Sequence, residues 1–222
     1  MRSRALSGFC CALTLSALPN LALAQATVAQ VFNGEMLGTN LRFFESVAGV
    51  ARTSFGDTHT YKVQGCEITA TAGGGTVSEL RMELSPTCKA DLSTFIGDFA
   101  PPAAQPLTFG AMARSSGGGL EFYASCLSMC GNAADPSVYA LWQGPRAVGF
   151  TEVLLEVVLV DDEASAAAGH WREAMQKAKG EDFVVDTRFN CERTFDEVAQ
   201  ASFDKVKVNA VTIGTELTKP GC

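Results

Sequence analysis

Apolar and polar residues alternate on either side of three consecutive glycines, at positions 73–75. Before them, residues 66–71 place three apolar side chains on one face and three polar ones on the other. Residues 79–84 repeat this pattern. The apolar positions are Cys66, Ile68, Ala70, Leu80, Met82 and Leu84. Period-two alternation is typical of a strand with one solvated face. The sequence therefore predicts an antiparallel meander here, with Cys66 facing the core.

Two segments have the period of an α-helix. Residues 39–49 carry apolar side chains at helical spacing, with Thr39 or Asn40 as a suitable N-cap and Gly49 as the end. Residues 161–180 have an acidic start, a basic end and a long apolar stripe. That stripe comprises Ala164, Ala167, Ala168, Trp171, Ala174, Met175 and Ala178. These features predict two helices.

The second half of the chain again alternates in short runs. We expect strands over residues 107–112, 120–126, 138–142, 148–160, 183–185 and 206–213. A last helix is expected from Phe195 to Phe203. Strands in runs with helices segregated between them indicate an α+β fold, here with antiparallel β-meanders.

Prolines and alanines gather in residues 98–106, which are the best candidate for a boundary. This predicts a helix plus β-meander module over 25–100, a Pro-rich linker over 101–106, and a second β-rich α+β module over 107–222. One continuous domain is the alternative. The glycine triplets at 73–75 and 117–119 hint at duplicated halves.

The N-terminus has the three parts of a secretory signal peptide: a basic start, an apolar stretch and an Ala-x-Ala site ending at Ala24. We expect residues 1–24 to be removed and the protein to be periplasmic or secreted. Cleavage removes two arginines and no acid, which changes the formal net charge from −7 to −9. It also removes Cys10 and Cys11 and leaves six of the eight cysteines.

Composition narrows the class of protein further. The chain is 47% hydrophobic and 18% charged, which is typical of a folded globular protein. Its negative charge argues against a nucleic-acid partner, because such binding depends on clustered cations. No segment after the signal reaches the length of a transmembrane helix.

Six cysteines in an exported chain predict up to three disulfides. Fifteen pairings are possible, and chain order favours neighbours. Between Cys126 and Cys130 a small loop-closing disulfide is the main interpretation, with redox or metal chemistry as alternatives. Redox enzymes separate the two cysteines by two residues rather than three. The expected pairs are Cys66 with Cys88, Cys126 with Cys130, and Cys191 with Cys222.

A Ser-x-x-Lys string at residues 202–205 lacks its partner motifs, and we assign no catalytic, metal or cofactor residue. His59 lies near Asp57, but no nucleophile can be paired with it. Glu152 and Glu156 would share a strand face about 13 Å apart, too far for a pair of glycosidase carboxylates. A carboxylate-dependent envelope hydrolase is kept as an alternative function.

Binding residues are better indicated than catalytic ones. Residues 126–146 combine a tight cysteine loop with aromatic, amide and charged side chains, which are the types that dominate protein-binding surfaces. An ordinary turn-rich connection with a buried tryptophan is the alternative. The candidate binding residues are Asn132, Asp135, Tyr139, Trp142 and Arg146.

Residues 35–84 resemble the helix plus β-meander module of β-lactamase-inhibitory proteins and small outer-membrane assembly lipoproteins. The resemblance is carried by Leu37-Gly38, a helix ending at Gly49, a strand from Tyr61, and the turn Gly75-Thr76-Val77. It implies binding to other envelope or secreted proteins. The chain departs from it in lacking a lipobox and in carrying Cys66. The Cys126–Cys130 spacing also resembles the disulfide loops of periplasmic lysozyme inhibitors.

Together these features predict an exported protein that binds or inhibits another envelope or secreted protein. An envelope assembly or structural factor is the first alternative, and the hydrolase is the second.

Overall fold

The computed structural model describes residues 25–127, 130, 136–185 and 189–222. The expected signal peptide and the candidate binding residues Asn132 and Asp135 lie outside the described residues. Among the described residues, no helix is both long and apolar enough to cross a membrane.

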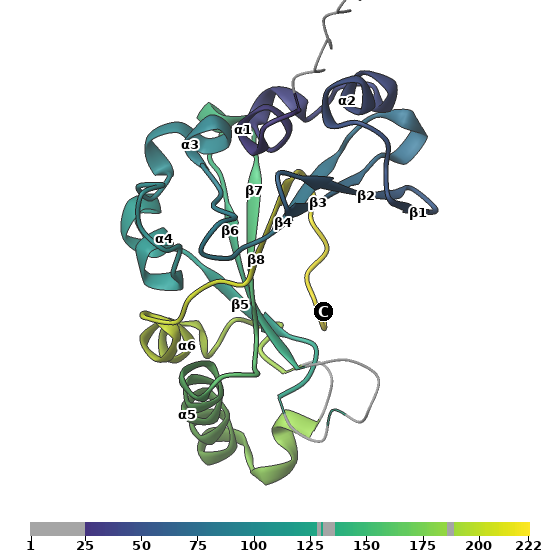
Figure 1. The fold of residues 1–222 in the computed structure, drawn as a ribbon. Coiled ribbons are helices and arrows are strands. Elements are labelled where there is room, and N and C mark those ends of the chain that lie inside the picture. Colours follow the sequence, from purple (N-terminus) through teal and green to yellow (C-terminus); the bar gives the residue numbers. More distant parts are fainter. Residues whose placement is uncertain (1–24, 128–129, 131–135, 186–188) are drawn as a thin grey trace, which may run out of the picture.

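One antiparallel sheet of eight strands runs through the molecule, in the order β1-β2-β3-β4-β8-β7-β6-β5 (Figure 1). Strands β1 to β4 form one half of the sheet and β5 to β8 the other, and the halves meet where β4 pairs with β8. Each half is a meander, except that helices separate β7 from β8. The strands are β1 (Thr53–Phe55), β2 (Thr58–Val63), β3 (Cys66–Thr71), β4 (Glu79–Glu83), β5 (Glu121–Ala124), β6 (Ser137–Gln143), β7 (Glu152–Val158) and β8 (Ala210–Gly214).

Helices cover one face of this sheet and its upper end in the view of Figure 1. They are α1 (Val28–Val31), α2 (Leu41–Ala48), α3 (Ser93–Ile96), α4 (Phe109–Ser116), α5 (Asp162–Lys179) and α6 (Asp196–Phe203). Short 3-10 helices are η1 (Gly34–Met36), η2 (Gly73–Gly75), η3 (Gly97–Phe99), η4 (Arg146–Val148) and η5 (Glu181–Val185). The architecture is therefore α+β, as the sequence predicted.

A single large core lies between the sheet and the helices. Alternate residues of every strand from β2 to β8 point into it, and each α-helix contributes at least one buried apolar side chain. One row of the register shows this: Ile68, Met82, Val211, Leu155, Ala140 and Phe122 are paired partners across six strands, and all are buried in the core. The aromatic centre of the core is Trp171, whose indole N–H donates to the Phe195 carbonyl.

Local sequence explains where the helices begin. The Asn40 side chain accepts a hydrogen bond from the Arg42 N–H and caps α2, while the Asp161 side chain accepts from the Ala164 N–H and caps α5. Acidic residues in the first turn of α5 and lysines in its last turn match the helix dipole.

Two expected strands are helices in the structure. Residues 107–112 contain the start of α4, because the Thr108 side chain caps this helix by accepting from the Ala111 N–H. Residues 183–185 belong to the 3-10 helix η5. Both are short apolar runs, for which alternation alone does not separate strand from helix.

The Pro-rich segment 101–106 leads from η3 to α4, and the sheet and core continue on both sides of it. Of the two glycine triplets, residues 73–75 connect β3 to β4, whereas residues 117–119 connect α4 to β5. They hold different positions in the two halves of the sheet, so they do not mark a repeat.

Three disulfides join the expected neighbours: Cys66–Cys88, Cys126–Cys130 and Cys191–Cys222. The first ties the start of β3 to the segment that follows β4. The third ties the C-terminal residue to the segment that precedes α6. Disulfides of this number are typical of oxidising compartments outside the cytosol.

Candidate functional site: the helix-free face of the sheet

The sheet residues that alternate with the core residues form a second surface, which we call the helix-free face. A register row of eight side chains crosses it from one edge of the sheet to the other: Thr53, Thr60, Thr69, Arg81, Thr212, Leu154, Leu141 and Glu121. The row is polar on β1 to β4 and β8, apolar on β7 and β6, and ends at the charged Glu121 on β5. The two parts of this face therefore differ in chemistry.

At the centre of the helix-free face, Arg81 on β4 reaches across β8 to Glu156 on β7. The guanidinium and the Glu156 carboxylate are 3.0 Å apart, with side chains 32% and 17% exposed. Burial alone would lower the pKa of Arg81, but its hydrogen bond and charge interaction with Glu156 outweigh burial and raise this pKa. The pair holds a charged arginine in a fixed position on the face.

Tyr139 lies next to this ion pair, because it is the register partner of Glu156. Burial, followed by the nearby Glu156 charge, raises the pKa of the Tyr139 hydroxyl. The tyrosine therefore stays neutral in the physiological range and is half-buried on the helix-free face.

A buried carboxylate, Glu121, lies at the β5 edge of the same face. It accepts hydrogen bonds from the Tyr123 hydroxyl, from Arg193 at 2.7 Å and from Lys219 at 2.9 Å. Burial alone would raise the pKa of this carboxyl, but the hydrogen bonds from Tyr123 and Lys219 and the charges of Arg193 and Lys219 lower it. Glu121 is thus an ionised anchor for the segments that carry the two cations.

One of those segments is the C-terminal strap, residues 215–222, which lies on the side of the sheet opposite α4, α5 and α6 (Figure 1). Leu217 packs against Tyr123 and Leu141, and its N–H donates to the Glu152 carboxylate at 2.6 Å. The strap therefore covers the apolar part of the helix-free face. The polar part, on β1 to β4 and β8, consists of exposed and half-buried side chains, apart from the small Ala210 and Gly214.

The structure separates the candidate binding residues of the sequence. Tyr139 lies on the helix-free face, whereas Trp142 is 4% exposed and packs in the core with its ring 5.6 Å from that of Phe99. Arg146 is exposed in the turn between β6 and β7. Odd and even positions of β6 point to opposite faces, so Tyr139 and Trp142 do not share a surface.

Sequence reasoning did not single out Arg81, Glu121 or Lys219. Alternation does place Arg81 on the polar side of β4. Its partner Glu156 is 75 residues away in the chain, and Lys219 is 98 residues from Glu121. No local pattern encodes these pairings.

Other titratable groups do not form a second centre in the described part of the chain. No group of three or more His, Cys, Asp or Glu residues there is arranged to hold a metal ion. His59 contacts the Ser54 hydroxyl at 2.9 Å in the β1–β2 hairpin.

Comparisons with known proteins give no relative: no family model, no curated protein and no solved structure matches this chain. The geometry of the helix-free face is therefore the basis for a functional proposal.

Proposed function

We propose that this is an exported protein that binds another envelope or secreted protein through the polar part of the helix-free face, which we call the docking face. Its central residues are Thr60, Thr69, Arg81 and Thr212, and Tyr139 on β6 borders it beside Glu156. The observation that carries the proposal is the one-sided packing of the sheet, which leaves a broad, regular polar surface on a rigid scaffold.

Rigidity favours binding because little conformational entropy is lost when the partner docks. Thr60, Thr69, Arg81 and Thr212 sit on strands with hydrogen-bonded neighbours on both sides, and Arg81 is held by Glu156. Arginine and tyrosine are also the residue types that contribute most at protein interfaces. The resemblance of residues 35–84 to inhibitory and assembly proteins agrees with this proposal.

Export is part of the proposal. The three disulfides fit an oxidising compartment, and the basic start, apolar stretch and Ala-x-Ala site at residues 1–24 fit a cleaved signal peptide. Mass spectrometry of the exported protein should find an N-terminus at Gln25 and no free thiol. A retained N-terminus or free thiols would contradict this part.

An envelope assembly factor would use the same face in a permanent complex, so it differs from an inhibitor in the lifetime of the complex. The hydrolase alternative requires a cleft with a carboxyl whose pKa is raised. Glu121, the buried carboxylate of the helix-free face, has a lowered pKa. No specific observation favours the hydrolase.

Site-specific photocrosslinking in the native compartment tests the docking face. A photoreactive residue at Thr69, on β3, should trap one dominant partner, whereas the same residue at Glu173, exposed on α5, should not. Excess purified wild-type protein should compete for the trapped partner. A Thr69→Arg variant should compete at least tenfold less well, since a large charged side chain blocks the face, and Glu173→Arg should compete like the wild type.

Equal crosslinking at both positions, or equal competition by both arginine variants, would contradict the docking face. Circular dichroism of the two variants provides the folding control, because both substituted positions lie outside the core.

A further inference from the structure

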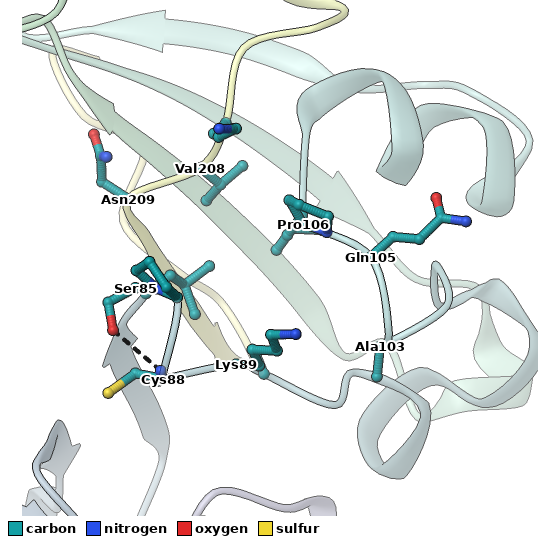
Figure 2. A pocket seen from close by; sticks show the side chains of 13 residues that line it. Ser85, Cys88, Lys89, Ala103, Gln105, Pro106, Val208 and Asn209 are labelled. Carbon is teal, nitrogen blue, oxygen red and sulfur yellow. Dashed lines mark hydrogen bonds between the residues drawn. The ribbon is translucent and has the colours of Figure 1, made fainter.

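A cavity of about 490 Å³ lies away from the helix-free face, where three segments meet: residues 84–90 after β4, residues 103–107 before α4, and residues 207–209 before β8 (Figure 2). Its volume is within the range of small-molecule sites. The apolar lining comprises Leu84, Pro86, Ala90, Ala103, Pro106, Leu107 and Val208, together with Cys88 of a disulfide.

The walls of the cavity are held by covalent and backbone bonds. The Leu84 N–H donates to the Asn209 carbonyl at 2.7 Å, and the Val208 N–H donates to the Leu107 carbonyl at 3.0 Å. The Cys66–Cys88 disulfide fixes residues 84–90 to β3. Two of the lining residues are prolines, which restrict the backbone further. The cavity is thus preformed and needs little ordering to receive a ligand.

The polar lining is cationic in a chain whose net charge is negative. Lys89 and Lys207 line the cavity, and neither forms an ion pair with a described residue. No carboxylate lines it. Of the acids that flank the lining segments, Glu83 pairs with Arg81, and Asp91 accepts from the N–H and hydroxyl of Ser93.

Two uncharged polar side chains lie at the rim and wall of the cavity. Gln105 is exposed, and in Figure 2 its side-chain amide points away from Ser85 and Lys89. Ser85 already accepts a hydrogen bond from the Cys88 N–H, drawn in Figure 2, so its oxygen helps to shape the wall. The cavity therefore combines an apolar lining with two ammonium groups that form no ion pair with a described residue.

We propose that this cavity binds a small organic anion with an apolar chain, of the class of medium-chain fatty-acid carboxylates. The chain lies against Leu84, Leu107 and Val208, and the carboxylate is held by Lys89 and Lys207. This activity is separate from protein binding at the docking face, since the two surfaces share no residue.

Size sets the length of the chain. The cavity volume of about 490 Å³ falls in the lower half of the range of small-molecule sites, about 300–1,000 Å³. Decanoate, with about twelve non-hydrogen atoms, is of a size suited to such a site. Acetate has the charge but not the chain, so it should bind far more weakly.

The test is isothermal titration calorimetry of the full exported protein with decanoate, acetate, decylammonium and decan-1-ol. Decanoate should bind with a dissociation constant of about 0.1–1 mM, and each of the other probes at least tenfold more weakly. Raising the ionic strength from about 0.01 M to 1 M should weaken decanoate binding, since it shortens the Debye length roughly tenfold.

Variants locate the site. Lys89→Gln with Lys207→Gln should weaken decanoate binding about tenfold, while the matched pair Lys62→Gln with Lys177→Gln, exposed elsewhere, should change it less than twofold. Ala103→Trp fills the cavity from an exposed position and should abolish binding without unfolding the protein.

Decanoate that binds no better than decylammonium, or binds unchanged to the Lys89/Lys207 or Ala103 variant, would overturn the proposal. So would binding of a leucine-ending peptide but not of decanoate, because the site would then recognise a chain terminus. Crosslinking at Thr69 does not depend on any of these results, so failure of this proposal and failure of the docking face can be told apart.

Discussion

At the scale of single residues, Phe150 adopts a left-handed backbone conformation that residues other than glycine and asparagine rarely take. Its φ is 58°, in the turn after η4, and its side chain is 60% exposed. A left-handed conformation costs about 1–2 kcal/mol, and asparagine tolerates it better. Phe150→Asn should therefore raise the free energy of unfolding by about 0.5–1 kcal/mol, as measured by urea denaturation.

The control for this prediction is Phe43→Asn, which removes an exposed phenylalanine from α2, where φ is negative. It should bring no gain, because no positive φ is relieved there and phenylalanine and asparagine have similar helix propensities. A loss of stability in Phe150→Asn would show that the Phe150 ring makes contacts that outweigh the backbone strain.

Glu121 links a single carboxyl to the pH dependence of folding. The pKa of its carboxyl is lowered from the ordinary 4.5. The ionised carboxyl therefore stabilises the fold above pH 4.5, and this stabilisation is lost as the pH falls through the lowered pKa. Glu121→Gln should cost about 1–3 kcal/mol at pH 7, and the difference from the wild type should narrow towards pH 3. Urea denaturation at both pH values checks this.

Glu173→Gln serves as the matched control for Glu121, since Glu173 is exposed on α5 and has no ion pair in the described chain. It should change stability by less than about 0.5 kcal/mol at either pH. A constant difference between Glu121→Gln and the wild type across the pH range would mean that the carboxyl charge does not stabilise the fold.

At the scale of elements, the edge strand β5 is completed by side chains rather than by another strand. The Phe122 N–H donates to the Asp196 carboxylate at 3.0 Å, and the Asn190 side-chain amide donates to the Phe122 carbonyl at 2.8 Å. Asn190 is 4% exposed and also accepts from the Phe195 N–H. These contacts satisfy an edge that would otherwise be open to pairing with another chain.

Asn190→Ala should destabilise the protein by about 2–3 kcal/mol, because it removes three hydrogen bonds from buried groups and places alanine at a φ of 57°. The Phe195 amide, which donates to Asn190, should exchange with deuterium faster. So should the Phe122 amide, because its acceptor Asp196 is itself held by Asn190. Asn40→Ala, which removes an exposed helix cap, should cost only about 1 kcal/mol and leave those amides unchanged. Equal losses in the two variants would contradict a special role for Asn190.

The elements were predictable to the extent that their signals are local. Alternation in residues 66–71 and 79–84 gave β3 and β4 the correct faces, and capping residues gave α2 and α5. The strand predicted over residues 107–112 was wrong, because the hydrogen bond from the Ala111 N–H to the Thr108 side chain favours a helix over a short alternating pattern. The cysteine pairs followed from chain order because each links segments that are close along the chain.

At the scale of the whole molecule, the candidate site depends on pairings that no local pattern contains. The docking face exists because β8 inserts between β4 and β7, which brings Arg81 within reach of Glu156. Alternation along β6 places Tyr139 on the helix-free side and Trp142 in the core. Residue type alone predicts that Tyr139 and Trp142 belong to one candidate binding surface.

The C-terminal strap is the feature of the whole molecule that most directly limits the helix-free face. Its disulfide, Cys191–Cys222, spans 31 residues and fixes the strap over the apolar part of that face. Replacing both cysteines with serine should cost about 3–4 kcal/mol by the chain-entropy estimate. The Leu217 amide, which donates to Glu152, should then exchange with deuterium faster.

Cys126→Ser with Cys130→Ser is the matched comparison for the strap, because that disulfide spans only four residues. It should cost about 2 kcal/mol, since the smaller loop removes less entropy from the unfolded chain. It should leave the Leu217 amide protected, because neither cysteine belongs to the strap. If the strap were held mainly by Lys219 and Leu217, the Cys191/Cys222 variant would unfold at lower urea concentration with Leu217 still protected. Faster exchange at Leu217 in that variant alone would show instead that the disulfide keeps the apolar part of the face covered.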